Sequence, residues 1–217
     1  MNIGLSMLYC LGESFPAMIK RLTEFDVTYV ELVDESQHAL NPKRVNILKR
    51  VARENGLEFT VHAPFVDINI ASPSPELRRV MLKRLERSLS YARQLRSRQW
   101  VFHSGWKSSV SEFYPNLDWQ INLRSVRSLL TTARKLGVEI SLENTPEPFH
   151  FLVKRMQDFA LFHSELGSDF DIDITLDIAH ANTTQQVFEF IEKFAAKIVH
   201  VHISDNEGKY DSHKGIG

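Results

Sequence analysis

The chain has 217 residues, of which 43% are hydrophobic and 24% are charged, a composition typical of a globular protein that buries one sizeable core. It carries 26 Lys and Arg against 27 Asp and Glu, so its formal net charge of -1 provides no global field that would attract a polyanion. Cys10 is the single cysteine, which excludes an internal disulfide and a cysteine-rich zinc site. The nine histidines and the carboxylates are therefore the candidate metal ligands.

The longest apolar runs are far shorter than the roughly 20 residues that a membrane-spanning helix needs. The amino-terminal residues contain no basic segment followed by a signal-like apolar run. We therefore expect a cytoplasmic protein without a membrane partner. The oligomeric state stays open at this point.

Short β-branched runs alternate with longer segments whose apolar residues recur three and four positions apart, the order expected of parallel strands joined by crossover helices. In chain order, the expected strands are Ile3–Met7, Val27–Val33, Glu58–His62, Gln99–His103, Glu139–Glu143, Ile172–Asp177 and Ile198–Ile203. The expected helices between them are Phe15–Phe25, Pro42–Asn55, Pro75–Leu95, Leu123–Leu136, Phe151–Leu166 and Gln185–Ala196. Ser74 before Pro75 is a helix-start signal, and Gly56, Gly137 and Gly167 are helix-stop signals.

This alternation predicts an α/β fold, a (β/α)₈ TIM barrel, forming a single domain over residues 1–217. A barrel of this type has eight strands in usually about 250 residues, whereas seven strands are recognisable here before Gly217. We therefore expect a barrel that is incomplete at its C-terminal end and lacks the eighth strand and the last helix. Natural shortening and truncation both remain possible explanations.

Polar residues stand where the expected strands end. Alternate residues of a strand face opposite sides, so Asp173, Thr175 and Asp177 share one face while the neighbouring isoleucines and leucine share the other. The apolar face is expected to pack on helices and the polar face to line the barrel, whose carboxyl-terminal rim carries the active site. The strand ends contribute His62, His103, Glu143, Asp177 with the nearby His180, and His202, and the last loop adds Asp211 and His213.

A lone histidine at a strand end is more often a hydrogen-bonded structural residue than a ligand. A series of histidines and carboxylates at five successive strand ends is hard to explain by packing, because ionisable groups are rarely buried without partners. Nitrogen and carboxylate ligands together favour Zn²⁺, Mn²⁺ or Fe²⁺ over Mg²⁺ or Ca²⁺. We interpret His200 as a structural interior residue, and His38, His150 and His163 as ordinary loop or helix residues.

Several stretches resemble the xylose isomerase-like TIM barrel superfamily, which includes sugar-phosphate isomerases and epimerases and the endonuclease IV enzymes (AP endonuclease family 2) of DNA repair. The resemblance covers essentially the whole chain. It is carried by His62-Ala63-Pro64-Phe65, Asn69-Ile70-Ala71-Ser72, His103-Ser104-Gly105, Leu142-Glu143-Asn144, Leu176-Asp177-Ile178-Ala179-His180-Ala181-Asn182, His202-Ile203-Ser204-Asp205-Asn206 and Asp211-Ser212-His213.

Resemblance to the epimerase branch implies one Zn²⁺ or Mn²⁺ ion held by Glu143, Asp177, His202 and a glutamate of the eighth strand, which has no counterpart in this chain. It implies His180 as a substrate contact and Glu143 as the catalytic base. The substrate would be a sugar or sugar phosphate. The metal would polarise the carbonyl and stabilise an enediolate while the carboxylate moves the proton on the adjacent carbon.

Resemblance to the endonuclease IV branch implies instead up to three Zn²⁺ ions and phosphodiester cleavage in abasic DNA, so a nucleic-acid partner belongs to this alternative alone. Its ligands would be His62, His103, Glu143, Asp177, His180, His202, Asp211 and His213, again with one glutamate missing. A non-catalytic metal-binding barrel is a further alternative. We favour the sugar branch for three reasons. The sequences of residues 176–182 and 204–208 look more like that branch, the net charge is near zero, and no loop with interleaved basic and aromatic residues is found for a DNA groove.

Overall fold

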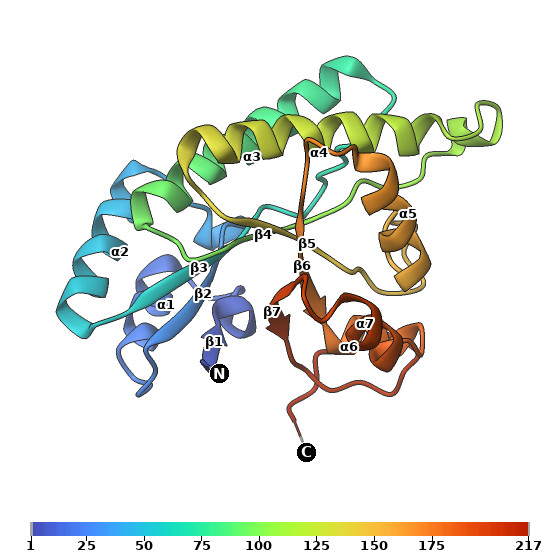
Figure 1. The fold of residues 1–217 in the computed structure, drawn as a ribbon. Helices are drawn as coiled ribbons and strands as arrows, with labels where there is room; N and C mark the ends of the chain where they lie inside the picture. Colours follow the sequence, from blue (N-terminus) through green and yellow to red (C-terminus); the bar gives the residue numbers. More distant parts are fainter. Residues whose placement is uncertain (1, 217) are drawn as a thin grey trace. The chain divides into compact units, whose positions relative to one another are not determined.

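The computed structural model describes residues 2–216, and within them strands and helices alternate along the chain as predicted (Figure 1). The strands are β1 (Gly4–Ser6), β2 (Tyr29–Val33), β3 (Glu58–His62), β4 (Trp100–His103), β5 (Ile140–Glu143), β6 (Asp173–Asp177) and β7 (Ile198–His202). The α-helices are α1 (Phe15–Leu22), α2 (Pro42–Asn55), α3 (Pro75–Leu95), α4 (Leu117–Leu136), α5 (Met156–Leu166), α6 (Ile178–Thr183) and α7 (Val187–Phe194). Short 3₁₀ turns occupy Met7–Cys10, Ser36–His38 and Ser109–Glu112.

The chain forms two compact units. The first comprises Met1–Asp67, Lys83–Phe102 and Thr132–Glu139, and the second comprises Ile68–Leu82, His103–Thr131 and Ile140–Gly217. In the first unit β1 pairs with β2, β2 with β3 and β3 with β4, all in parallel. In the second unit β5 pairs with β6 and β6 with β7, also in parallel. The assignment of residues 1–217 to one domain stays a prediction.

The predicted elements are confirmed, and β3, α2 and α3 have the predicted bounds. Helix α4 begins six residues earlier than predicted, whereas α5 begins five residues later. The late start of α5 has a local cause, because the Asp158 Oδ2 atom accepts hydrogen bonds from the backbone N–H groups of Lys154 and Arg155 at 3.0 and 2.8 Å. Helix α6 was not predicted, since it follows β6 with no intervening loop.

Each unit has its own apolar core. In the first unit, the fully buried Trp100 stacks on Phe102 with ring centroids 5.2 Å apart, and its indole N–H donates to Ser88 Oγ at 3.1 Å. In the second unit, Phe159 of α5 packs edge-to-face on Phe190 of α7 at 5.4 Å. These cores hold the strands whose ends carry the polar residues.

Strand β7 differs from its neighbours in register and in exposure. Ile198 pairs with Ile174 but His200 pairs with Thr175, so the register shifts by one residue and Val199 is the extra residue. His202 therefore lies opposite Asp177 at the end of β6. The outward face of β7, which we expected to pack on helices, is exposed: Val199 and Val201 are at 50% and 44% of full exposure, and Ile203, which follows the strand, is at 63%.

No helix in the part of the chain that the structure describes is both long and apolar enough to cross a membrane. The cytoplasmic location stays a prediction.

The buried side chain of His38 leads to a prediction of how the stability of the first unit depends on pH. Its ring is buried, its Nε2 atom donates to the Glu13 carbonyl at 3.1 Å, and its Nδ1 atom is buried without a hydrogen-bond partner among the described residues. Burial holds the pKa of His38 below its usual value, helped by the neighbouring Arg44 guanidinium. The unfolded chain then binds more protons than the folded chain, so we expect the free energy of unfolding to fall as the pH is lowered through about 6.5.

Urea unfolding at pH 8, 6.5 and 5 tests this expectation. The variant His38→Gln should show a smaller loss of stability between pH 8 and pH 5 than the unmodified chain. His150→Gln, which changes an exposed histidine, serves as the matched control and should keep the full loss. An unchanged pH dependence in His38→Gln would contradict the assignment of a neutral buried imidazole.

Candidate metal centre

Three neighbouring strands of the second unit each end on an ionisable residue. Glu143, Asp177 and His202 are the last residues of β5, β6 and β7. Glu143 pairs with Thr175, two positions before Asp177, and residues two apart on a strand share a face. The register shift in β7 then sets His202 beside Asp177. Parallel pairing and one bulge therefore bring the three side chains together.

Glu143 is the centre of this group, and its side chain is only 2% exposed. Its Oε1 atom lies 2.8 Å from His202 Nδ1, and its Oε2 atom lies 3.0 Å from His103 Nε2. Burial opposes ionisation of Glu143, but His202 and His103 outweigh it and hold the pKa of the carboxyl well below its usual range. Glu143 is therefore a buried carboxylate that stays ionised.

The two oxygens of Asp177 have different partners. Oδ1 accepts a hydrogen bond from the backbone N–H of His180 at 2.7 Å and so caps the start of α6. Oδ2 faces His202 Nδ1 at 3.8 Å. Burial, opposed by His180 and reinforced by the charge of Glu143, raises the pKa of Asp177. The repulsion between the negative charges of Asp177 and Glu143 is of the kind that a bound cation relieves.

The donor set fits a divalent transition metal. Ligand atoms at about 2.0–2.2 Å from one cation lie roughly 3–4 Å from each other. His202 Nδ1 lies 2.8 Å from Glu143 Oε1 and 3.8 Å from Asp177 Oδ2. His180 Nδ1 lies 3.6 and 3.8 Å from the same two oxygens, and Glu143, Asp177 and His180 offer ligand atoms within 4.8 Å of one another. Two carboxylates and one imidazole suit Zn²⁺ or Mn²⁺. We call Glu143, Asp177 and His202 the strand-end triad.

His180 lies beside the two carboxylates of the triad, but its two ring nitrogens have different hydrogen-bond partners. Its Nδ1 atom donates to the Asn144 carbonyl at 2.7 Å, which leaves Nε2 facing Asp211 Oδ2 at 3.1 Å. Burial lowers the pKa of His180, but Asp211, Asp177 and Glu143 outweigh it and raise the pKa to about 9. The available nitrogen of His180 therefore belongs to a second cluster.

That second cluster consists of His180, Asp211 and His213, which we call the loop cluster. Asp211 Oδ2 lies 2.9 Å from His213 Nε2, while Asp211 Oδ1 is buried and has no hydrogen-bond partner among the residues that the structure describes. Burial opposes ionisation of Asp211, yet the two imidazoles hold its pKa well below the usual range. An ionised, buried oxygen without a donor is well placed to bind a cation.

Asn206 fixes the loop that carries Asp211 and His213. Its side-chain oxygen accepts hydrogen bonds from Asn182 Nδ2 at 2.8 Å and from the Gly208 N–H at 2.9 Å. Its amide nitrogen donates to the Ala179 carbonyl at 2.7 Å. The loop is thereby tied to α6, the helix that carries His180.

The loop after β4 supports His103. The Gly105 N–H donates to Asn122 Oδ1 at 2.8 Å, and a Cβ atom on Gly105 would lie 2.4 Å from the Cβ of Ala71. A glycine is therefore required where this loop passes residues 69–71. The Phe151 ring lies edge-on to the His103 ring, with centroids 5.5 Å apart.

Among the predicted site residues, His103, Glu143, Asp177, His180, His202, Asp211 and His213 all lie in the second unit. His62 lies at the end of β3 in the first unit, where its Nδ1 atom is 2.9 Å from the Ala63 carbonyl oxygen and its ring contacts Phe65 edge-on at 5.3 Å. Its role as a ligand stays a prediction.

Asn144 supports the backbone of the candidate site, and the sequence analysis mentioned it only as part of a motif. It is fully buried, its Nδ2 atom donates to the Asp177 carbonyl at 3.0 Å, and its Oδ1 atom accepts from the Asp177 N–H at 2.7 Å. The side chain thus replaces a ladder partner and fixes the backbone of Asp177. A buried amide directly after a strand-end carboxylate is the signal that indicates such a clamp.

The Asn144 clamp predicts a coupled loss of stability and of metal affinity. In Asn144→Ala, two hydrogen bonds are lost and two buried backbone groups are left unpaired, so the free energy of unfolding should fall by about 2–4 kcal/mol. Loss of such a supporting partner typically weakens metal binding by about 10-fold or more. Asn144→Asp keeps the acceptor, so its free energy of unfolding and its metal affinity should lie between those of the unmodified chain and those of Asn144→Ala.

Urea unfolding of the metal-free protein and a Mn²⁺ or Zn²⁺ competition titration measure both effects. Asn182→Ala, which removes one half-exposed amide with a single side-chain partner, is the control and should lose only about 0.5–1.5 kcal/mol. Equal losses in the two alanine variants would contradict the clamp.

Comparison with known proteins gives three close likenesses. The Methanocaldococcus jannaschii protein MJ1311 is 32% identical over 228 residues, covering 100% of this chain and 75% of the relative. A D-psicose 3-epimerase of Ruminiclostridium cellulolyticum is 26% identical, covering 64% of this chain and 48% of the relative. The crystal structure of a D-tagatose 3-epimerase-like protein superposes with a TM-score of 0.89 at 30% identity, covering 98% of this chain and 79% of that chain.

The family model described as xylose isomerase-like TIM barrel matches residues 19–217. This match confirms the predicted fold class, of which the described residues contain seven of the eight strands. This match agrees with the alternating parallel strands and with the metal-ligand side chains at the strand ends. The chain therefore belongs to the xylose isomerase-like TIM barrel family.

Proposed function

We propose that the protein is a divalent-metal-dependent epimerase or isomerase of a keto sugar or its phosphate. The observation that carries this proposal is the strand-end triad, in which a buried, ionised carboxylate converges with a second carboxylate and an imidazole. The relatives named D-psicose 3-epimerase and D-tagatose 3-epimerase-like protein support the same class of reaction.

Within this proposal the chain supplies a base and the groups that hold it. Glu143 is the base, since His202 and His103 keep its carboxylate ionised at neutral pH and fix both oxygens. Asp177 and His202 complete the ligand set, with Asp177 Oδ2 left available because Oδ1 caps α6. When bound, Zn²⁺ or Mn²⁺ supplies Lewis-acid polarisation of the substrate carbonyl.

His180 is the proposed substrate contact. Its Nε2–H, held by the Nδ1 hydrogen bond to the Asn144 carbonyl, is available to donate to a substrate oxygen in place of Asp211. His180 follows Asp177 by three residues, so the proposed substrate contact lies close in the chain to a proposed metal ligand. Glu143 and His180 are thus the proposed catalytic residues.

Solvent exchange tests the role of Glu143. With Mn²⁺ present, the protein should catalyse the incorporation of deuterium from D₂O into D-fructose, D-psicose or D-tagatose, at the carbon next to the carbonyl. NMR measures this exchange. In Glu143→Gln the rate should fall by about 10³-fold or more, because a carboxamide cannot accept the proton. The control Glu112→Gln changes an exposed glutamate and should keep the wild-type rate. Absence of exchange in all three ketoses and in D-fructose 6-phosphate, with loaded metal, would sink the proposal.

The loop cluster favours a second candidate, a zinc phosphodiesterase of the endonuclease IV kind acting on abasic DNA. The specific observation is that His180, Asp211 and His213 offer ligand atoms within 4.8 Å of one another, separately from His202. Two or more metal ions a few Å apart would suit the activation of water and the stabilisation of a phosphodiester transition state. Metal number separates the two candidates.

Elemental analysis of the protein and of His213→Ala measures that number. The epimerase proposal predicts about one ion per chain in both proteins, because His213 lies outside the strand-end triad. The phosphodiesterase candidate predicts two or three zinc ions per chain and a loss of at least one in His213→Ala. Absence of bound metal even after reloading would contradict both candidates and leave a barrel without a metal role.

A further inference from the structure

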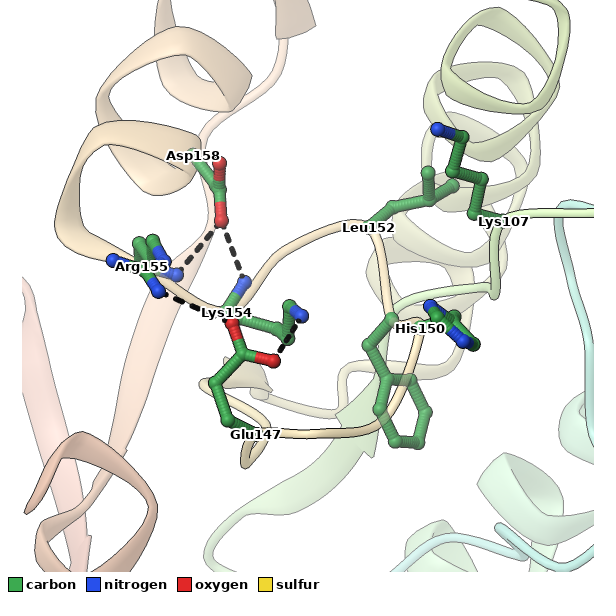
Figure 2. A pocket seen from close by; sticks show the side chains of 8 residues that line it. Lys107, Glu147, His150, Leu152, Lys154, Arg155 and Asp158 are labelled. Atoms are coloured by element: carbon green, nitrogen blue, oxygen red, sulfur yellow. Dashed lines mark hydrogen bonds and ion pairs between the residues drawn. The ribbon is translucent and has the colours of Figure 1, made fainter. Parts of the chain in front are cut away.

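A polar cavity of about 280 Å³ lies in the second unit, on the loop between β5 and α5 (Figure 2). It is distinct from the strand-end triad and the loop cluster, none of whose residues line it. Cationic and acidic side chains surround it, namely Lys107, Lys154, Arg155, Glu147 and Asp158, together with His150.

The two carboxylates of the cavity are occupied by internal partners. Glu147 Oε2 accepts from Lys154 Nζ at 2.8 Å, and Glu147 Oε1 accepts from Arg155 at 3.3 Å. Asp158 Oδ2 accepts the backbone N–H groups of Lys154 and Arg155. Figure 2 shows the Lys154 and Arg155 side chains directed toward Glu147. The lysine hydrogen bond, opposed by partial burial, lowers the pKa of Glu147, so these charges stay paired.

Lys107 provides the excess charge. The cavity has three permanent cations against two carboxylates, and the Lys107 ammonium has no ion pair within residues 2–216. Its backbone N–H donates to the His150 carbonyl at 2.7 Å, which places Lys107 and His150 side by side across from the Glu147 group (Figure 2). The cavity is therefore net positive, and Lys and Arg are the side chains that bind phosphate.

Two contacts connect this cavity to the residues of the candidate metal centre. The Phe151 ring lines the cavity and packs on the His103 ring, whose Nε2 atom is bonded to Glu143. The Glu147 N–H donates to Thr183 Oγ1 at 3.0 Å, and that hydroxyl donates to the His180 carbonyl at 2.7 Å. The cavity and the candidate metal centre are thus joined through Phe151 on one side and Thr183 on the other.

We infer that this cavity is an anion subsite that takes the phosphate of a phosphorylated ketose, with Lys107 as its recognition residue. The inference rests on the proposed function and narrows its substrate class to sugar phosphates. A volume of about 280 Å³ lies just below the range of about 300–1,000 Å³ for ligand pockets, which suits one terminal group of a substrate rather than a whole large ligand.

Calorimetric titration of the full chain with D-fructose and D-fructose 6-phosphate at low ionic strength tests the subsite, because the second probe adds a phosphate to the same ketose. The phosphate ester should bind at least about 10-fold more tightly, a difference of about 1.4 kcal/mol. Lys107→Ala should abolish most of that preference and leave D-fructose binding unchanged. Lys49→Ala, which removes an exposed lysine of α2, should keep the preference.

Equal affinities for the two probes, or equal losses in Lys107→Ala and Lys49→Ala, would overturn the subsite. Lys107 is exposed, so both variants should melt at the wild-type temperature. Titration of inorganic phosphate into chelator-treated protein separates this inference from the proposed function. Lys107-dependent phosphate binding without deuterium exchange in any ketose would retain the subsite and reject the epimerase. Exchange on free and phosphorylated ketoses alike, with no Lys107 effect, would do the reverse.

Discussion

The arrangement of the second unit follows from one constraint, the burial of an ionised carboxylate at Glu143. A charge removed from water is costly unless charged or hydrogen-bonding partners surround it. His103 and His202 meet one oxygen each, at 3.0 and 2.8 Å, and both come from strand ends. His202 can be in place only if β7 ends at the right level beside β6, and His103 only if the loop after β4 is held by its contacts within the unit. The position of this one side chain therefore depends on the strand registers of the unit.

Parallel pairing alone does not bring His202 to the position opposite Asp177. The one-residue shift in β7, with Val199 as the extra residue, sets His202 opposite Asp177. Asn144 then fixes the Asp177 backbone from the neighbouring strand end, and Asp177 in turn caps α6. The chain of contacts from Glu143 to His180 thus runs through backbone groups. Such contacts hold a geometry more firmly than contacts between flexible side-chain tips.

The seven strands and most of the candidate site could be predicted from the sequence, because period-two alternation and β-branched runs locate strands and because strand ends of parallel sheets share one edge. The bulge at Val199 could not, since a register shift depends on pairing across strands and leaves no local signal. The division of His180 between Asn144 and Asp211 could not either, because it depends on ring orientation. The cavity at Lys107 brings together two loops that are distant in sequence, and the sequence analysis treated His150 as an ordinary residue.

The Asn144 clamp binds main-chain atoms of Asp177 and none of its side-chain atoms. The place of residue 177 in space is therefore independent of which side chain stands there. A different side chain at this position would keep the Asn144 hydrogen bonds but lose the cap that Asp177 Oδ1 provides at the start of α6. Two tasks at one residue are thus separated, since Asn144 holds the backbone of residue 177 while the side chain of that residue caps α6 with one oxygen and faces His202 with the other.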